Sequence, residues 1–257
     1  CETAVVPQLD VEGQNIHYEV AGDGPPIVFL HGGTGDAASY WEHQVPAFAE
    51  EFKVITLDHR GYGKSGLVET KNYLESCADD IDRLLDHIGA AKAHLVGLSL
   101  GGRVALQFAL QHPQRLARLV LADTLSGVRT EKLRRFMDDV LIATARNAGM
   151  ERVFDLNLLW AFSEEYLSDH ADEVTAQRKG WAEQSAEDFA NVLEASRDID
   201  VTDELHNIAA PTLVIWGSQD IEVPRLYADL LVENIANSMM VVIEGSGHKT
   251  CVEKPSE

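Results

Sequence analysis

Apolar residues follow two alternating patterns along this chain. Short runs dominated by Val, Ile and Leu are typical of strands buried on both faces of a parallel sheet. The longer stretches between them carry apolar residues at helical spacing and predict amphipathic helices. The predicted strands are residues 27–30, 53–57, 93–96, 116–122, 212–216 and 239–243, and the predicted helices include 37–50, 72–88 and 102–111.

The order of these elements predicts the fold class. Residues 5–11 and 15–20, joined at Glu12-Gly13-Gln14, add an opening hairpin. Alternation of strand and helix then gives an α/β fold with a mostly parallel, doubly wound, eight-stranded sheet and helices on both of its faces. In such sheets ligands bind at the carboxyl ends of the strands.

One segment, residues 126–198, contains no convincing strand. It is rich in Glu, Arg, Ala and Leu, and apolar residues recur at helical spacing at Leu133, Phe136, Met137, Val140 and Leu141. We predict about three or four helices here, forming a lid over one edge of the sheet. The predicted domain organisation is a core of residues 1–125 and 199–257 with a helical cap, residues 126–198, inserted into it.

A serine between two glycines marks a passage from strand to helix. Gly97-Leu98-Ser99-Leu100-Gly101 lies directly after the strand at 93–96 and before the helix at 102–111. A tight turn of this kind presents a hydroxyl nucleophile, and its glycines leave room for the chain to fold back. Because the short motif also arises by chance, its setting and its partners decide its meaning. Ser99 is the candidate nucleophile.

An acid and a histidine follow Ser99 in the order that this arrangement requires. Asp220 and His248 each stand just beyond a predicted strand, on loops at the same sheet edge as Ser99. A histidine can take the serine proton while a carboxylate fixes its tautomer, so the three residues predict a catalytic triad. Asp123, which follows the strand at 116–122, is the alternative acid, and its structural interpretation is a carboxylate that caps a loop.

Five stretches in this order resemble the α/β-hydrolase superfamily over nearly the whole chain. They are residues 28–35 (VFLHGGTG), 58–66 (DHRGYGKSG), 97–102 (GLSLGG), 217–224 (GSQDIEVP) and 247–255, which begins with Gly-His. The resemblance implies an α/β-hydrolase fold with an inserted cap. Within the superfamily the chain is most similar to small esterases, enol-lactonases and related ring-opening or C–C bond hydrolases.

The resemblance also implies roles for individual residues. Asp220 is favoured over Asp123 as the acid because it carries the Gly-x-x-Asp-x-x-x-Pro context of the family. The oxyanion hole is expected to use two backbone N–H groups. One belongs to Leu100, directly after the nucleophile. The other belongs to Gly33, in the loop that follows the strand at 27–30, with Thr34 as the alternative.

The predicted function is that of a serine hydrolase. It would cleave the carboxylic ester or lactone of a small, fairly apolar molecule through an acyl-enzyme, with no cofactor and no metal. The alternatives are a C–C bond hydrolase or a thioesterase with the same triad, and a receptor on this fold that binds a ligand without turnover. The candidates for an apolar substrate pocket are Trp41, Trp160, Phe162 and Trp181, and Glu253 is expected to begin a closing helix.

Composition limits the range of partners. The net charge of -21, from 42 acidic and 21 basic residues, disfavours binding to nucleic acid or to an anionic membrane surface. Three cysteines, Cys1, Cys77 and Cys251, form neither a disulfide framework nor a metal motif. No signal segment or membrane span is apparent. We therefore expect a soluble, cytoplasmic protein with a small-molecule partner, whose oligomeric state the sequence leaves open.

Overall fold

An eight-stranded sheet forms the centre of the molecule, as predicted. The computed structural model describes residues 8–11, 13–66 and 71–257, and the order of its strands is β1-β2-β4-β3-β5-β6-β7-β8. β1 and β2 pair antiparallel with each other, β2 pairs antiparallel with β4, and the remaining pairs are parallel. The strands are β1 Gln8–Val11, β2 Gln14–Ala21, β3 Pro26–Leu30, β4 Lys53–Leu57, β5 Ala93–Leu98, β6 Leu116–Ala122, β7 Thr212–Gly217 and β8 Ser238–Ile243.

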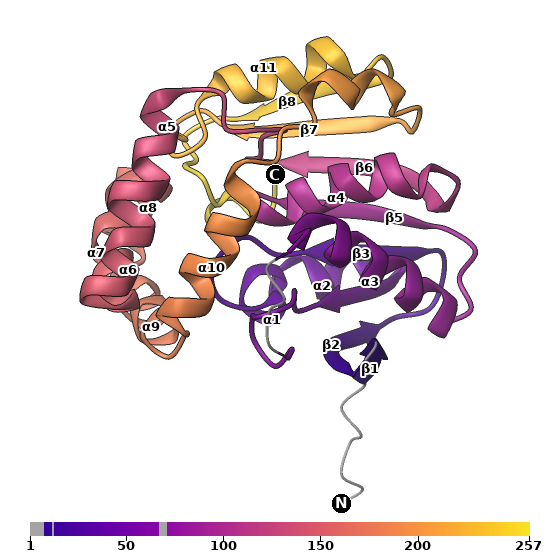
Figure 1. The fold of residues 1–257 in the computed structure, drawn as a ribbon, viewed down its shortest axis with the longest axis horizontal. Coiled ribbons are helices and arrows are strands. Elements are labelled where there is room, and N and C mark those ends of the chain that lie inside the picture. The colour runs from indigo at the N-terminus through magenta and orange to yellow at the C-terminus, as the bar shows by residue number, and fades with distance from the viewer. Residues whose placement is uncertain (1–7, 12, 67–70) are drawn as a thin grey trace, which may run out of the picture.

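Helices cover both faces of the sheet because the strand residues are apolar on both sides. In β3, Val28 and Leu30 belong to one core cluster, whereas Ile27 and Phe29 belong to another. Successive side chains of a strand point to opposite faces, so these clusters are the two sides of the sheet. The first side carries α3 Tyr73–His87, α4 Leu100–Gln111 and α11 Arg225–Asn234, and the second carries α1 Ala37–Trp41 and α2 Gln44–Phe48 (Figure 1).

The single helix predicted over residues 37–50 is in fact two short helices. α1 ends at Trp41, and α2 begins at Gln44 and contains Pro46. Proline has no N–H to donate to the carbonyl four residues earlier, and its ring crowds that carbonyl, which here belongs to Glu42. The break between α1 and α2 falls at this position.

The segment between β6 and β7, for which a lid is predicted and which we call the lid, is built from helices. It has more helices than predicted, since Gly149 at φ 80° ends one of them and the side chains of Ser163 and Ser185 cap the starts of two others. Figure 1 shows these helices together at one end of the sheet. They are α5 Glu131–Arg135, a π-helical turn Phe136–Ile142, α6 Ala143–Ala148, α7 Met150–Ala161, α8 Glu164–Asp169, α9 Ala171–Ala182 and α10 Ala186–Arg197.

Two expectations about the chain ends fall partly outside the described residues. The hairpin exists as β1 and β2, although residues 5–7 and 12 of the predicted hairpin are not described. Cys1 also lies outside the described ranges, while Cys77 and Cys251 are free thiols. Within the described ranges, no helix is long and apolar enough to cross a membrane.

Candidate active site

Ser99 occupies a strained turn between β5 and α4. Its backbone has φ 53°, a conformation that non-glycine residues rarely adopt, and it is held by a hydrogen bond from Ser99 N to Ala122 O of 3.0 Å. A side chain on Gly97 would collide with the backbone of Gly101, and one on Gly101 would collide with the carbonyl of Leu30. The two glycines of the motif are therefore required by close backbone approach.

Asp220 and His248 are brought together at the ends of β7 and β8. The His248 Nδ1–H donates to Asp220 Oδ2 at 2.9 Å, and both side chains are buried. The other oxygen of Asp220 accepts the backbone N–H of Val223 at 2.8 Å, which orients the carboxylate. This pair is the acid and base arrangement expected beside a serine nucleophile.

Asp123, the alternative acid, lies close by but bonds to other groups. Its carboxylate accepts the backbone N–H of Gly217 at 2.9 Å and the hydroxyl of Thr250 at 2.7 Å. Burial and the neighbouring charge of Asp220 raise the pKa of Asp123 to about 8. Asp123 thus ties the loops after β7 and β8 together, whereas Asp220 contacts the imidazole.

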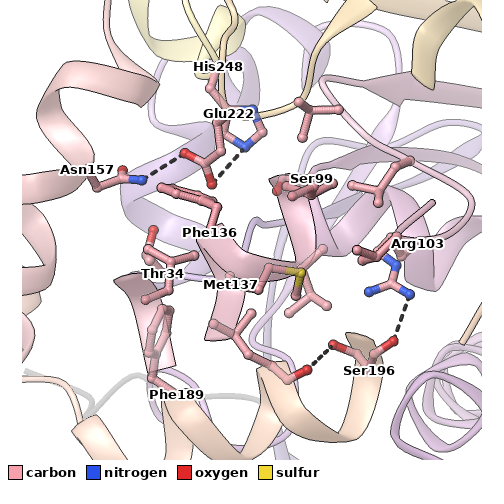
Figure 2. Close-up of a pocket in the computed structure, with 18 of the residues that line it drawn as sticks. Thr34, Ser99, Arg103, Phe136, Met137, Asn157, Phe189, Ser196, Glu222 and His248 are labelled. Atoms are coloured by element: carbon pink, nitrogen blue, oxygen red, sulfur yellow. Dashed lines mark hydrogen bonds and ion pairs between the residues drawn. The ribbon is translucent and has the colours of Figure 1, made fainter. Parts of the chain in front are cut away.

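Ser99 and His248 line the same cavity, which we call the inner cavity (Figure 2). Within the described part of the chain, no hydrogen bond joins the Ser99 hydroxyl to the imidazole. Instead, His248 Nε2 lies 3.8 Å from Glu222 Oε1, and the second oxygen of Glu222 accepts a hydrogen bond of 2.8 Å from Asn157 of the lid. Catalytic hydrogen bonds are often long before substrate binds.

The charges around His248 determine its protonation. Burial alone would lower the pKa of His248, since the imidazolium loses its water. The carboxylates of Asp220 and Glu222 act in the opposite direction and outweigh burial, so the pKa of His248 lies above its ordinary value. The site favours the positively charged imidazole that forms when this residue takes a proton.

The two loops expected to form an oxyanion hole are adjacent. Gly33 and Leu100 both line the inner cavity, and a Cβ placed on Gly33 would meet the Cβ of Leu100 at 3.9 Å. The N–H of Leu100 is in the first turn of α4, where amides have no partner within the helix. The Gly33 loop is held by His31, whose Nδ1–H donates to Gly32 O at 2.7 Å and whose Nε2 accepts from His59 N at 3.0 Å.

Apolar lid residues form the wall of the inner cavity opposite Ser99. The volume of the inner cavity is about 80 Å³. Figure 2 shows Phe136, Met137 and Phe189 facing the space beside Ser99. The π-helical turn at Phe136–Ile142 lies in this wall. The lid residues that line the cavity include Leu133, Phe136, Met137, Leu141, Phe189 and Leu193.

Of the four aromatic residues predicted for the pocket, only Trp181 lines it. Trp41 packs against Phe29 with a ring separation of 4.9 Å, in the core cluster on the α1 side of the sheet. Trp160 packs on Phe136 from outside the cavity, and Phe162 is buried in a small separate cluster of the lid. Trp41, Trp160 and Phe162 therefore serve packing, whereas Phe136 and Phe189 are lid aromatic residues that line the cavity without having been predicted to.

Sequence reasoning missed three charged residues that line the inner cavity, namely Arg103 on α4, Glu222 and Lys249. Glu222 stands two positions after Asp220, and Lys249 directly follows His248, and both line the inner cavity. The signal in the sequence was that Glu222 and Lys249 stand beside the predicted acid and base in their motifs.

Glu253 differs from its prediction. It is the last residue of α12 Thr250–Glu253, not the first, and its carboxylate accepts the backbone N–H groups of Gly247 at 3.0 Å and Ser163 at 3.1 Å.

The described side chains do not form a metal site. No group of three or more His, Cys, Asp or Glu residues in the described ranges is arranged to hold a metal ion. The polar groups that line the inner cavity include the hydroxyl of Ser99, the imidazole of His248, and the charges of Glu222, Arg103 and Lys249. Such a set is suited to nucleophilic and acid–base chemistry.

Comparisons with known proteins agree with this fold. A family model described as alpha/beta hydrolase fold matches residues 25–255. The protein named "Putative carbamate hydrolase RutD" from Rhizobium rhizogenes strain K84 is 29% identical over 250 residues, which covers 94% of either chain.

Solved structures give the same result. The enol-lactonase from Burkholderia xenovorans LB400 has a TM-score of 0.88 and 28% identity, over 97% of this chain and 95% of that chain. A hydrolase from Pseudomonas aeruginosa PA01 has a TM-score of 0.89 and 28% identity, over 99% and 95% of the two chains. Since the family model and the fold both extend over nearly the whole sequence, this chain belongs to the alpha/beta hydrolase fold family.

Proposed function

We propose that this protein is a serine hydrolase that cleaves the carboxylic ester or lactone of a small, fairly apolar molecule through an acyl-enzyme. One observation carries the proposal. The hydrogen-bonded pair of Asp220 and His248, 2.9 Å apart, lies at a cavity that is also lined by Ser99, on a turn that holds this serine at φ 53°. Membership of the family and the enol-lactonase among the similar structures support hydrolysis at an acyl carbon.

In the first step the Ser99 hydroxyl attacks the carbonyl carbon. His248 takes the serine proton at Nε2, while Asp220 holds the Nδ1–H and stabilises the imidazolium. The developing oxyanion is stabilised by the N–H groups of Leu100 and Gly33, each worth about 3–4 kcal/mol of barrier. The imidazolium then protonates the departing alkoxide, and in a lactone this alkoxide remains attached as the ring opens.

In the second step water releases the acyl group. His248 removes a proton from a water molecule, which attacks the acyl carbon, and the proton then returns to Ser99 as the acyl–oxygen bond breaks. The apolar lid wall favours an acyl portion without charge near the scissile bond. Phe136, Met137 and Leu141 belong to that wall.

The test is covalent labelling together with turnover. The protein should react with a fluorophosphonate probe and release p-nitrophenol from a short-chain ester with an initial burst. Ser99→Ala should abolish both signals and leave the circular dichroism spectrum unchanged. Ser168→Ala, which alters an exposed serine on α8, should leave both intact. Labelling and turnover that survive Ser99→Ala would exclude Ser99 as the nucleophile.

One observation favours the receptor alternative. His248 Nε2 lies next to Glu222 and makes no hydrogen bond to Ser99 among the described residues. A receptor would retain a ligand in the inner cavity with negligible turnover, and it would react with the fluorophosphonate barely or not at all. C–C bond or thioester cleavage would use the same triad, and a panel of esters, lactones, thioesters and diketones separates these activities.

A further inference from the structure

Lys249 is a buried cation at the boundary between two cavities. Its side chain follows that of His248 in the chain, and the residue is only 5% exposed. It lines the inner cavity and also a wider outer cavity of about 980 Å³. Tyr40, Trp181 and Phe189 line both cavities as well, so the lysine belongs to the wall that the two cavities share.

The ammonium of Lys249 is surrounded by aromatic rings. Its Nζ lies 5.0 Å from the ring centre of Tyr40 and 5.1 Å from those of Phe162 and Trp181. Its hydrogen bond to Gln177 Oε1 is long, at 3.5 Å. Among the residues that the structure describes, no carboxylate oxygen lies within 4.0 Å of this nitrogen.

This environment stabilises the positive charge without neutralising it. The faces of aromatic rings attract a cation, yet they leave its net charge in place and do not use its N–H donors as a carboxylate would. Burial lowers the pKa of Lys249 to about 8, so the side chain is still mainly protonated at neutral pH. A buried charge normally has a close partner of opposite sign. Glu222 and Glu253 act on the Lys249 charge from farther away, and no carboxylate of the described residues lies within 4.0 Å of its nitrogen.

The other cation of the inner cavity is different. Arg103 donates through Nη2 to the carbonyl oxygens of Ser196 and Ile199, both at 2.8 Å. These carbonyls lie at the end of α10, so Arg103 caps that helix and its charge is engaged in structure. The buried Arg103 Nε has no hydrogen-bond partner among the described residues, but the guanidinium is fixed to α10. Of the two cations, Lys249 is the one that also lines the outer cavity.

We propose that Lys249 binds an anionic group of the substrate, a carboxylate, at the boundary between the two cavities, so that the preferred esters or lactones carry a carboxylate at the end remote from the scissile bond. This inference rests on the proposed function. A charge-assisted hydrogen bond in a desolvated site is among the stronger polar interactions, which makes a buried ammonium an effective determinant of specificity.

The acidic residues of the site set the orientation of such a substrate. Glu222 lines the inner cavity and not the outer one, so it repels a carboxylate from the inner cavity. Lys249 lines both cavities. The anionic end therefore points outward and the scissile carbonyl inward, towards Ser99. Acidic residues also line the outer cavity. Glu42, Glu173 and Glu183 are exposed and Asp36 and Asp188 are half-buried, so water and salt screen all five more than they screen the buried lysine.

The experiment compares charged and neutral substrates of equal shape. Monomethyl esters of the straight-chain dicarboxylic acids from succinate to suberate are matched with the corresponding methyl ester amides, in which a neutral amide replaces the carboxylate. For at least one chain length, kcat/KM should be about ten- to a hundredfold higher for the acid than for the amide. Lys249→Met should remove this difference through KM, and Lys249→Arg should retain most of it.

The matched control is Lys132→Met. Lys132 is exposed on the lid and lies 5.9 Å from the ring centre of Trp160, so it is a lysine over an aromatic ring away from both cavities. This variant should keep the preference for the acid. Equal rates for acid and amide in the wild type would overturn the proposal, and so would an equal loss for both substrates in Lys249→Met, which would mean that the lysine only holds the lid.

Failure of the proposed function is separable from failure of this inference. If neither the esters nor the fluorophosphonate react, the hydrolase proposal is wrong, and binding of the free dicarboxylates is then measured by calorimetry. Binding of adipate or a neighbouring homologue that is lost in Lys249→Met supports the anion site. Equal binding to both proteins, or binding to neither, contradicts it.

Discussion

His248 Nε2 lies 3.8 Å from a carboxylate oxygen of Glu222, on the opposite side of the imidazole from its hydrogen bond to Asp220. The imidazole is thus placed between two carboxylates. One stands on a loop of the core and fixes the tautomer, and the other is held from the lid through Asn157. The Glu222 carboxylate therefore influences the pH at which the His248 imidazole loses its proton and can act as the base.

Replacing Glu222 by glutamine should move the acid limb of the pH profile. The negative charge beside Nε2 favours the imidazolium, so its removal lowers the pKa of His248, and the neutral base exists at lower pH. The acid limb of kcat/KM should shift to lower pH by about one unit, measured on a neutral ester. Glu233→Gln, at an exposed position on α11, should leave the profile in place. An unchanged acid limb in Glu222→Gln would show that this carboxylate does not act on the base.

The two aspartates should be separable by turnover. Asp220→Asn removes the acceptor for the His248 Nδ1–H and should lower kcat by about four orders of magnitude. Asp123→Asn keeps one acceptor oxygen for Gly217 N but disturbs the contact with Thr250, so its main effect should be on stability. Steady-state kinetics and denaturant unfolding of both variants check this. A larger loss of kcat in Asp123→Asn would identify Asp123 as the acid.

A buried ion pair away from the cavity should contribute to stability. Arg60 donates two hydrogen bonds to Asp80, of 2.5 and 2.7 Å, and both side chains are buried. Arg60→Met leaves the Asp80 charge without this partner and should reduce the free energy of unfolding by about 3 kcal/mol. The double variant Arg60→Met with Asp80→Leu should recover part of that loss in urea denaturation. A double variant less stable than the single one would contradict this account.

Two glycines should respond in opposite ways to alanine. Gly101→Ala places a methyl group against the carbonyl of Leu30, which cannot move without distorting the sheet, and should lower the free energy of unfolding by about 3 kcal/mol or more. Gly180 is inside α9 with open space around it, so Gly180→Ala should stabilise the protein by about 0.5–1 kcal/mol. Thermal unfolding of the two variants tests both signs. A tolerated Gly101→Ala would mean that the turn at Ser99 is looser than described.

The preference for anionic substrates should fade at alkaline pH. Burial lowers the pKa of Lys249 to about 8, so the ammonium is charged below this pH and loses its charge as the pH rises through it. The ratio of kcat/KM for a half-ester to that for its amide should fall towards one above about pH 8, while deprotonation of His248 affects both substrates alike. A ratio that stays constant would contradict a role for the ammonium. The titratable groups around Lys249 are Tyr40, Glu222, His248, Cys251 and Glu253.

Much of the fold could be predicted because local sequence and burial agree. Strand β3 is apolar on both faces, and the glycines around Ser99 reflect a turn that no larger residue can make. The positions of Asp220 and His248 follow from strands that end at the same sheet edge. These features depend on the backbone, and the backbone is what short sequence patterns encode.

The lining of the cavity could be predicted less well, because it depends on the direction of individual side chains. Phe136 and Met137, from the predicted helical repeat, line the inner cavity. Trp41, which was predicted to line the pocket, packs instead on Phe29 in the core. Glu222 and Lys249 sit within recognised motifs, and only the tertiary structure shows that their charges face His248 and the cavity.

The loop that carries His248 is joined to the lid by one backbone hydrogen bond and by the side chain of Glu253. His248 N donates to Ala161 O at 2.8 Å, and the Glu253 carboxylate accepts N–H groups from both Gly247 and Ser163. Exchange of this lid for that of a relative would therefore alter the placement of the imidazole as well as the shape of the binding space. A chimera intended to change selectivity should retain the junction at 161–163 and graft only the helices beyond it.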